Sequence, residues 1–286
     1  MDIKAIGMGV AFAAMWSSAF TSAKIAVQYA PPFAILGVRF AISGLLAVGI
    51  ARALGQSARL TRSQWQAVIG FGLLQNVIYL GGNFWAAQFI EASLAVIIAS
   101  LLPLLVAAAN AVRGERLGRV ATLGLIAGLA GVLLIMGSRL GGGADPVGVA
   151  IVVLGVLALT AATLLVRGAS GGDNVIMVVG LQMLVGSAAL LPLSLVIEDW
   201  VIDWDWRLVA AFTYTTLVPG LLATVTWFTL VRRIGATRAA TFHFLNPFLG
   251  VAIASLLLGE ALGWRDMAGV AVIMGGILAV QLAKRR

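Results

Sequence analysis

The chain has 286 residues, of which 61% are hydrophobic and only 10% are charged, and its formal net charge is +8. A soluble domain averages about 25% charged residues and could not bury so much apolar surface, so the composition excludes an ordinary soluble protein. Cysteine is absent, which excludes disulfides, thiolate metal sites and thiol catalysis.

Long uncharged runs predict an all-α integral membrane protein with ten transmembrane helices. A helix needs roughly 20 apolar residues to cross the ~30 Å hydrocarbon core, and every lipid-facing backbone group must be hydrogen-bonded within the helix. The first run lacks a strongly basic segment before it, so it is interpreted as a span and not as a signal peptide. The predicted spans are residues 5–28, 32–51, 64–87, 92–112, 120–137, 146–166, 174–197, 208–231, 239–258 and 267–283.

The basic residues predict the orientation of the chain. With the N-terminus inside, two basic residues lie within spans, three lie outside, and 14 of the 19 lie in cytoplasmic segments: Lys4, Arg52, Arg59, Arg62, Arg113, Arg116, Arg119, Arg167, Arg232, Arg233, Arg238, Lys284, Arg285 and Arg286. This bias predicts that both termini lie in the cytoplasm. The expected location is a bacterial-type cytoplasmic (inner) membrane. Because basic loops explain the net charge, no nucleic-acid partner is expected.

The two halves of the chain correspond to one another. Pro103 in the fourth predicted span corresponds to Pro247 in the ninth, and the pair Gly114-Glu115 corresponds to Gly259-Glu260. We therefore expect two repeats, residues 1–140 and 144–286. Because each repeat holds five spans, the second must cross the membrane upside down relative to the first, an arrangement typical of secondary transporters.

These motifs also carry a resemblance to a known family. A proline in the fourth span, a following Gly-Glu pair, a glycine-spaced fifth span (Gly124 and Gly131; Gly269 and Gly276) and an early Trp16-Ser17-Ser18 make the chain similar to the EamA modules of the drug/metabolite transporter superfamily. Size and layout resemble the YddG-type exporters within it. The resemblance implies an exporter of amino acids, including aromatic or other hydrophobic ones, and of related metabolites.

Polar residues within spans predict a central cavity, because such residues are costly in contact with lipid. Asn76, Tyr79 and Asn83 share one face of the third span, and His243 and Asn246 repeat this spacing in the ninth. Spans three, four, eight and nine are expected to line the cavity. The alternative is that serine, threonine and asparagine hydrogen-bond between helices. The predicted lining residues are Trp16, Ser17, Tyr79, Asn83, Ser100, Trp227, His243 and Asn246.

His243 is the only histidine and allows three interpretations. It could titrate and couple transport to protons, stay neutral and hydrogen-bond a substrate, or be a satisfied interior side chain. No aspartate or glutamate lies deep in a predicted span, which disfavours a dedicated cation/proton antiporter and favours facilitated diffusion as an alternative.

Lys24 and Arg39 are the basic residues within predicted spans. Either could contact a substrate carboxylate. Alternatively, Lys24 could extend to the outer interface, and Arg39 could pair with a carbonyl or a helix end. With basic but no acidic groups at depth, the cavity is expected to prefer neutral, zwitterionic or weakly anionic solutes. Neither a cofactor nor a metal is expected.

Pro103, Pro219 and Pro247 are predicted as hinges for alternating access, although prolines can equally form static kinks. A transporter is the favoured function. The alternatives are a channel or receptor and an intramembrane enzyme. One histidine, no cysteine and no deep acid provide no catalytic set, and no phosphate-binding loop is present.

Overall fold

The structure of the protein, a computed structural model, describes residues 3–141, 143–165 and 174–283. The predicted basic residues Arg167, Lys284, Arg285 and Arg286 lie outside the described residues. All regular elements within the described ranges are helices.

Ten helical segments in this part of the chain are long and apolar enough to cross a membrane, which confirms the predicted all-α, ten-span fold. The first five are α1 (Ile3–Ala26), α2 (Pro32–Ala53), α3–η1–α4 (Arg62–Phe71, Gly72–Gly81, Gly82–Ala86), α5–α6 (Ala92–Ala99, Leu102–Val112) and α7 (Arg119–Gly141). The second five are α8 (Pro146–Leu165), α9 (Val175–Ile197), α10–η2–α11 (Trp206–Thr215, Thr216–Leu222, Ala223–Ile234), α12–η3–α13 (Ala236–Ala240, Thr241–Leu245, Asn246–Leu258) and α14 (Trp264–Ala283).

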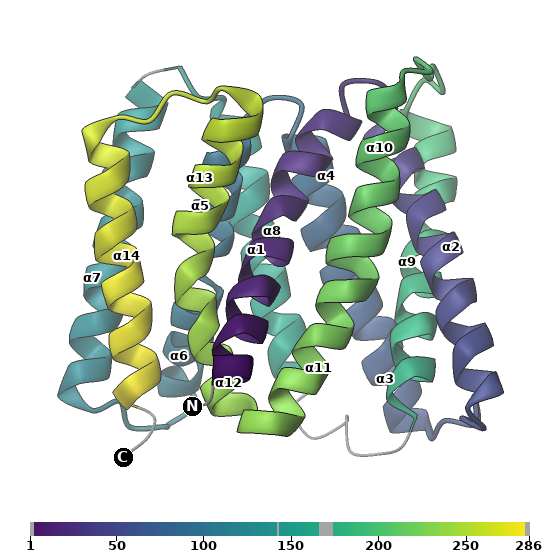
Figure 1. Ribbon diagram of the computed structural model, residues 1–286, viewed down its shortest axis with the longest axis horizontal. Coiled ribbons are helices and arrows are strands. Elements are labelled where there is room, and N and C mark those ends of the chain that lie inside the picture. Colours follow the sequence, from purple (N-terminus) through teal and green to yellow (C-terminus); the bar gives the residue numbers. More distant parts are fainter. Residues whose placement is uncertain (1–2, 142, 166–173, 284–286) are drawn as a thin grey trace.

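The helices stand side by side in one bundle (Figure 1). At one end of the bundle α7 packs along α14, and at the other α2 packs along α9. Each of these pairs takes one helix from each half of the chain. The first helix begins and the last helix ends at the same edge of the bundle. The inverted relation between the two halves stays a prediction.

Glycines set the distance between α7 and α14. A Cβ atom added to Gly276 would lie 2.5 Å from the carbonyl oxygen of Gly124, and one added to Gly269 would lie 2.9 Å from that of Gly131. Small residues allow helix backbones to approach this closely in a membrane, where van der Waals packing drives association. The four glycines that marked the fifth and tenth predicted spans therefore face one another.

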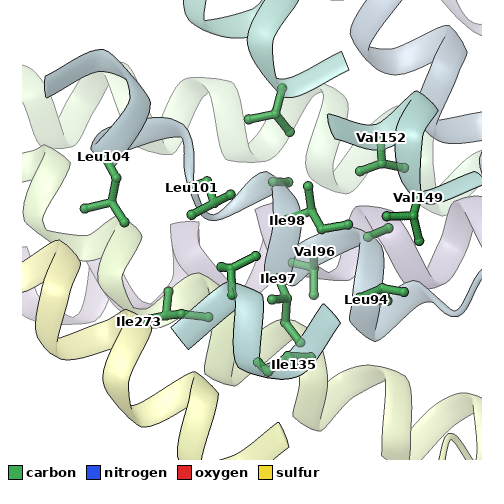
Figure 2. Packing of buried hydrophobic residues seen from close by; sticks show 14 of the residues in the cluster. Leu94, Val96, Ile97, Ile98, Leu101, Leu104, Ile135, Val149, Val152 and Ile273 are labelled. Carbon is green, nitrogen blue, oxygen red and sulfur yellow. The ribbon is translucent and has the colours of Figure 1, made fainter. Parts of the chain in front are cut away.

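The fourth span lies at the centre of the bundle. Every residue of α5 is buried, and α5 contacts α1, α7, α8 and α13. Figure 2 shows Leu94, Ile97 and Ile98 of α5 among side chains of the neighbouring helices, including Val152 of α8 and Ile273 of α14. Because the helix is enclosed on all sides, its sequence has no polar face.

Four spans are interrupted near their middle, at corresponding places in the two halves. Spans three and eight each contain a π-helical segment, η1 and η2. Spans four and nine each restart as a new helix whose first turn holds Pro103 or Pro247. Proline costs little there because the first N–H groups of a helix have no intrahelical partner. Pro219 lies inside η2.

The two Gly-Glu motifs mark helix ends. Gly114 and Gly259 follow spans four and nine and have positive φ angles of 96° and 69°, a conformation that glycine adopts without strain. Glu260, which follows Gly259, accepts hydrogen bonds from the backbone N–H groups of Ala92 (2.7 Å) and Ser93 (2.9 Å). The motif in the second half thus caps the first turn of α5.

Candidate functional site

A cavity of about 360 Å³ lies in the middle of the bundle. A second cavity of about 350 Å³ adjoins it and shares several of its walls, including Trp16, Gln75, Pro219 and His243. We call the two together the central chamber. Its lining comes from α1, α2, the third span, α5, α6, α8, α9, the eighth span and η3, so that both halves of the chain contribute.

Aromatic rings surround His243 in the wall of the chamber. The centroid of the imidazole lies 5.2 Å from that of Trp227, 5.4 Å from that of Phe12 and 5.9 Å from that of Trp16. Edge-on arrangements at these distances are favourable for aromatic pairs. We call Phe12, Trp16, Trp227 and His243 the aromatic cluster; it offers flat apolar surfaces to a solute.

Asn246 orients the imidazole. The side-chain amide nitrogen of Asn246 lies 2.9 Å from Nδ1 of His243. The hydroxyl of Ser17 donates to the backbone carbonyl of Asn246 at 3.2 Å. His243 lies in η3 and Asn246 begins α13, so this contact spans the interruption of the ninth span. Asn246 therefore contacts His243 directly, and Ser17 bonds to Asn246; neither residue lines the chamber.

The polar stripe of the third span lines the chamber and also bonds to backbone. Asn76, Tyr79 and Asn83 are all lining residues. The amide of Asn76 donates to the carbonyl of Gln182 on α9 at 2.8 Å, and that of Asn83 donates to the carbonyl of Tyr79 at 2.7 Å. Cavity lining and interhelical bonding, predicted as alternatives, are thus combined in Asn76.

Among the residues that the structure describes, two charged side chains line the chamber, Arg39 and Glu91. Arg39 is buried, with 7% of its surface exposed, and its guanidinium lies 5.7 Å from the ring centroid of Phe40. Within the residues that the structure describes, it makes neither an ion pair nor a hydrogen bond. Glu91, by contrast, is paired with Arg139, which also bonds to Asp266 at 2.9 Å.

Burial raises the pKa of Glu91 above its ordinary value. The positive charge of Arg139 opposes this rise, whereas the carboxylates of Glu260 and Asp266 add to it. Lys24 lies beside the same group: its ammonium donates to the carbonyl of Ile90 at 2.9 Å and does not line the chamber. These charges form a network at the edge of the bundle where α5 begins.

The chain matches the EamA-like transporter family twice, over residues 3–137 and 146–282. The protein belongs to this family. The predicted resemblance is therefore confirmed, and the protein is a multi-pass membrane transporter and not an enzyme. Its substrate is a small molecule and its surroundings are a lipid bilayer.

Similar proteins cover nearly the whole EamA-like chain. YvbV of Bacillus subtilis, an uncharacterized transporter, is 26% identical over 93% of this chain and 88% of its own length. YedA of Escherichia coli K12, an uncharacterized inner membrane transporter, is 24% identical over 94% and 88%. A probable amino-acid metabolite efflux pump of Salmonella typhimurium is 26% identical over 92% and 90%. One solved crystal structure, 22% identical, shares the fold with a TM-score of 0.71 over 100% of both chains.

In this EamA-like transporter, the predicted site residues fall into two groups. Those that line the chamber are Trp16, Arg39, Tyr79, Asn83, Pro219, Trp227 and His243. Those that do not line it are Ser17, Lys24, Ser100, Pro103, Asn246 and Pro247; the hydroxyl of Ser100, for instance, donates to the carbonyl of Val96 at 2.7 Å. Their roles in binding and gating remain predictions.

The chamber is wider than the sequence predicted. Besides spans three, four, eight and nine and the predicted residues Trp16 and Arg39 of the first two spans, it uses α8 and α9. Side chains such as Thr163 and Met183 come from these two helices, and further apolar side chains such as Phe12 and Phe40 come from α1 and α2. Apolar residues in apolar spans carry no sequence signal for a cavity. Thr163 in the sixth span and Gln182 in the seventh are polar lining residues that could have indicated this part of the wall, although the hydroxyl of Thr163 bonds to the carbonyl of Leu159 at 2.8 Å.

Proposed function

We propose that this transporter exports amino acids, especially aromatic or other hydrophobic ones, and related small metabolites by alternating access through the central chamber. The observation that carries the proposal is the aromatic cluster around His243 in the wall of a cavity lined by both halves of the chain. A cavity of about 360 Å³ has the size of a small-molecule site. The relative from Salmonella typhimurium, named a probable amino-acid metabolite efflux pump, supports the substrate class.

The interruptions in spans three, four, eight and nine support alternating access. Discontinuous helices commonly form the substrate site of a transporter, because the breaks near the bilayer midplane leave backbone groups free to contact a substrate. Pro219, in η2, touches the chamber directly, and Pro103 and Pro247 each lie where a span restarts. We propose these three places as hinges between the two access states.

The membrane and the orientation belong to the same proposal. The basic residues predict that both termini are cytoplasmic, and the bacterial relative YedA is named an inner membrane transporter. We therefore place the transporter in a cytoplasmic membrane, with inverted repeats and with the Glu91 network at the outer edge. A reporter fused after Arg139 tests this orientation; a cytoplasmic signal there would reverse it.

Counterflow in proteoliposomes tests the transport mechanism. Vesicles loaded with unlabelled phenylalanine are expected to accumulate labelled phenylalanine transiently and saturably, as a carrier does; a flux that stays linear with concentration and shows no counterflow would indicate a channel. Trp16→Ala is expected to reduce counterflow about tenfold by removing a stacking surface. Trp264→Ala is the matched control, because Trp264 is exposed and lies outside the chamber.

A further inference from the structure

The guanidinium of Arg39 is a buried positive charge without a protein counter-ion. It lies in the membrane-spanning part of α2, with 7% of its surface exposed, in the wall of the chamber. Its cation–π contact with the adjacent Phe40, at 5.7 Å, is the one interaction found for it in the described part of the chain. Such a contact is weaker than the cost of burying an ion, so a further partner is expected.

The protein leaves room for the guanidinium at Gly220. A Cβ atom at this position would lie 3.3 Å from Nη2 of Arg39 and 3.2 Å from the carbonyl oxygen of Thr215. Gly220 follows Pro219 in η2, and both line the chamber beside Arg39. The guanidinium thus lies against the backbone of Gly220, which has no side chain to cover it, and a solute in the chamber can reach it.

No free acid lines the chamber within the described residues. Glu91 is the other charged lining residue, and its carboxylate is already paired with Arg139. The wall therefore offers an anion one free guanidinium and offers an ammonium group no free carboxylate. A single guanidinium matches the single charge of a carboxylate, with which it can form two parallel hydrogen bonds.

We propose that Arg39 binds the carboxylate of the substrate, and that the transporter accepts small monocarboxylates with an aromatic or apolar body whether or not they carry an ammonium group. The body would lie against the aromatic cluster, which lines the same chamber. This inference rests on the proposed transport through that chamber and narrows its substrate class from metabolites in general to carboxylates.

Calorimetric binding of two isosteric probes to the protein in nanodiscs tests the inference. The probes are 3-phenylpropionate and the neutral 3-phenylpropanamide, which differ in charge and hardly in shape. The wild-type protein is expected to prefer the carboxylate about ten- to a hundredfold, the range for a hydrogen bond to a charged group. Arg39→Met is expected to abolish the preference and to leave the melting temperature unchanged or higher, because it removes an unpaired buried charge.

Two further variants make the result specific. Arg265→Met removes the same charge from an exposed position outside the chamber and should keep the preference. Lys24→Met should keep it too, because the Lys24 ammonium bonds to the carbonyl of Ile90. If the preference is lost in Lys24→Met and retained in Arg39→Met, the inference is overturned.

Other outcomes are equally decisive. Equal binding of both probes by the wild-type protein overturns the inference, and counterflow of phenylalanine then still decides separately whether transport occurs. If Arg39→Met does not fold, Arg39→Lys is measured in its place: it keeps the charge and loses the two-pronged donor, so the preference should fall several-fold. An unchanged preference in Arg39→Lys would then overturn the inference.

Discussion

The side-chain amide nitrogen of Asn246 donates to Nδ1 of His243 at 2.9 Å. In this orientation of the amide its nitrogen can only donate, so Nδ1 accepts and the neutral ring carries its hydrogen on Nε2. Because His243 lines the chamber, this contact equips the ring to donate a hydrogen bond to a solute. Of the three interpretations of His243 that the sequence allows, this geometry supports the neutral hydrogen-bonding one.

This geometry predicts a single tautomer of His243. Since the chain has one histidine, ¹⁵N-histidine labelling gives an unambiguous pair of NMR signals. We expect one protonated Nε2 and one unprotonated Nδ1 in the wild-type protein, and a mixture of tautomers in Asn246→Leu, which also leaves Nδ1 without its donor. Asn83→Leu is the control, because the amide of Asn83 bonds to Tyr79 and not to the ring. Identical spectra for wild type and Asn246→Leu would show that the contact does not set the tautomer.

Two adjacent glycines of α14 predict opposite effects of the same substitution. A Cβ atom at Gly276 would lie 2.5 Å from the carbonyl oxygen of Gly124 on α7, whereas nothing lies within 4 Å of one at Gly275. We expect Gly276→Ala to force the helices apart and to cost about 1–3 kcal/mol, as overpacking does. Gly275→Ala should be neutral or stabilising by up to about 1 kcal/mol, since alanine favours a helix. Thermal unfolding in detergent measures both, and equal melting temperatures would contradict the close crossing.

The sequence predicts the fold well because run length and charge placement are global constraints. A membrane allows few arrangements, so ten long and predominantly apolar runs give ten spans. The glycine spacing of the fifth and tenth spans was also recognised in the sequence, and its four glycines all lie in the α7–α14 contact: Gly124, Gly131, Gly269 and Gly276. The packing of α7 against α14 could not be predicted, because periodicity within one helix does not identify the helix that it faces.

The candidate site is only partly predictable for two physical reasons. Hydroxyl groups within spans, such as those of Ser17 and Ser100, bond to backbone carbonyls behind the chamber wall, so polarity alone does not show which way they face. Residues such as Phe12 and Met183 line the chamber with apolar surface, which resembles a lipid-facing surface in sequence. The π-helical segments were also missed, because the spacing of Asn76, Tyr79 and Asn83 equally fits an α-helix.

Two carboxylates from the second half of the chain cap helices of the first. Glu260 accepts from the N–H groups that begin α5, and Glu198 accepts from those of Phe33 (2.9 Å) and Ala34 (3.0 Å), which begin α2. Each of Glu198→Gln and Glu260→Gln is expected to cost about 1 kcal/mol, as lost helix caps do. Asp199→Asn, at an exposed position beside Glu198, should cost less. Urea or thermal unfolding measures the three, and a larger loss for Asp199→Asn would contradict the capping role.

The raised pKa of Glu91 predicts how stability depends on pH. Since burial raises the folded-state pKa above its ordinary value of 4.5, the folded protein binds this proton more tightly than the unfolded chain does. Stability from this group is therefore complete below about pH 4.5 and declines as pH rises through the raised pKa. As the pH rises from about 4.5 through the raised pKa of Glu91, the melting temperature of the wild-type protein should fall relative to that of Glu91→Gln. The reverse slope would mean that the pair with Arg139 outweighs burial.

Gly220→Ala tests the position of the Arg39 guanidinium without removing its charge. The new methyl group would lie 3.3 Å from Nη2 and 3.2 Å from the carbonyl oxygen of Thr215, and the side chain can move more easily than the backbone. We therefore expect the guanidinium to shift and the preference for 3-phenylpropionate over 3-phenylpropanamide to fall several-fold, with a small change in melting temperature. Gly82→Ala serves as a control for one added methyl group in a span, because its nearest neighbour is Ile151 and not Arg39. If both variants keep the wild-type preference, the placement of Arg39 against Gly220 does not control binding; if both lose it equally, the effect is one of general packing.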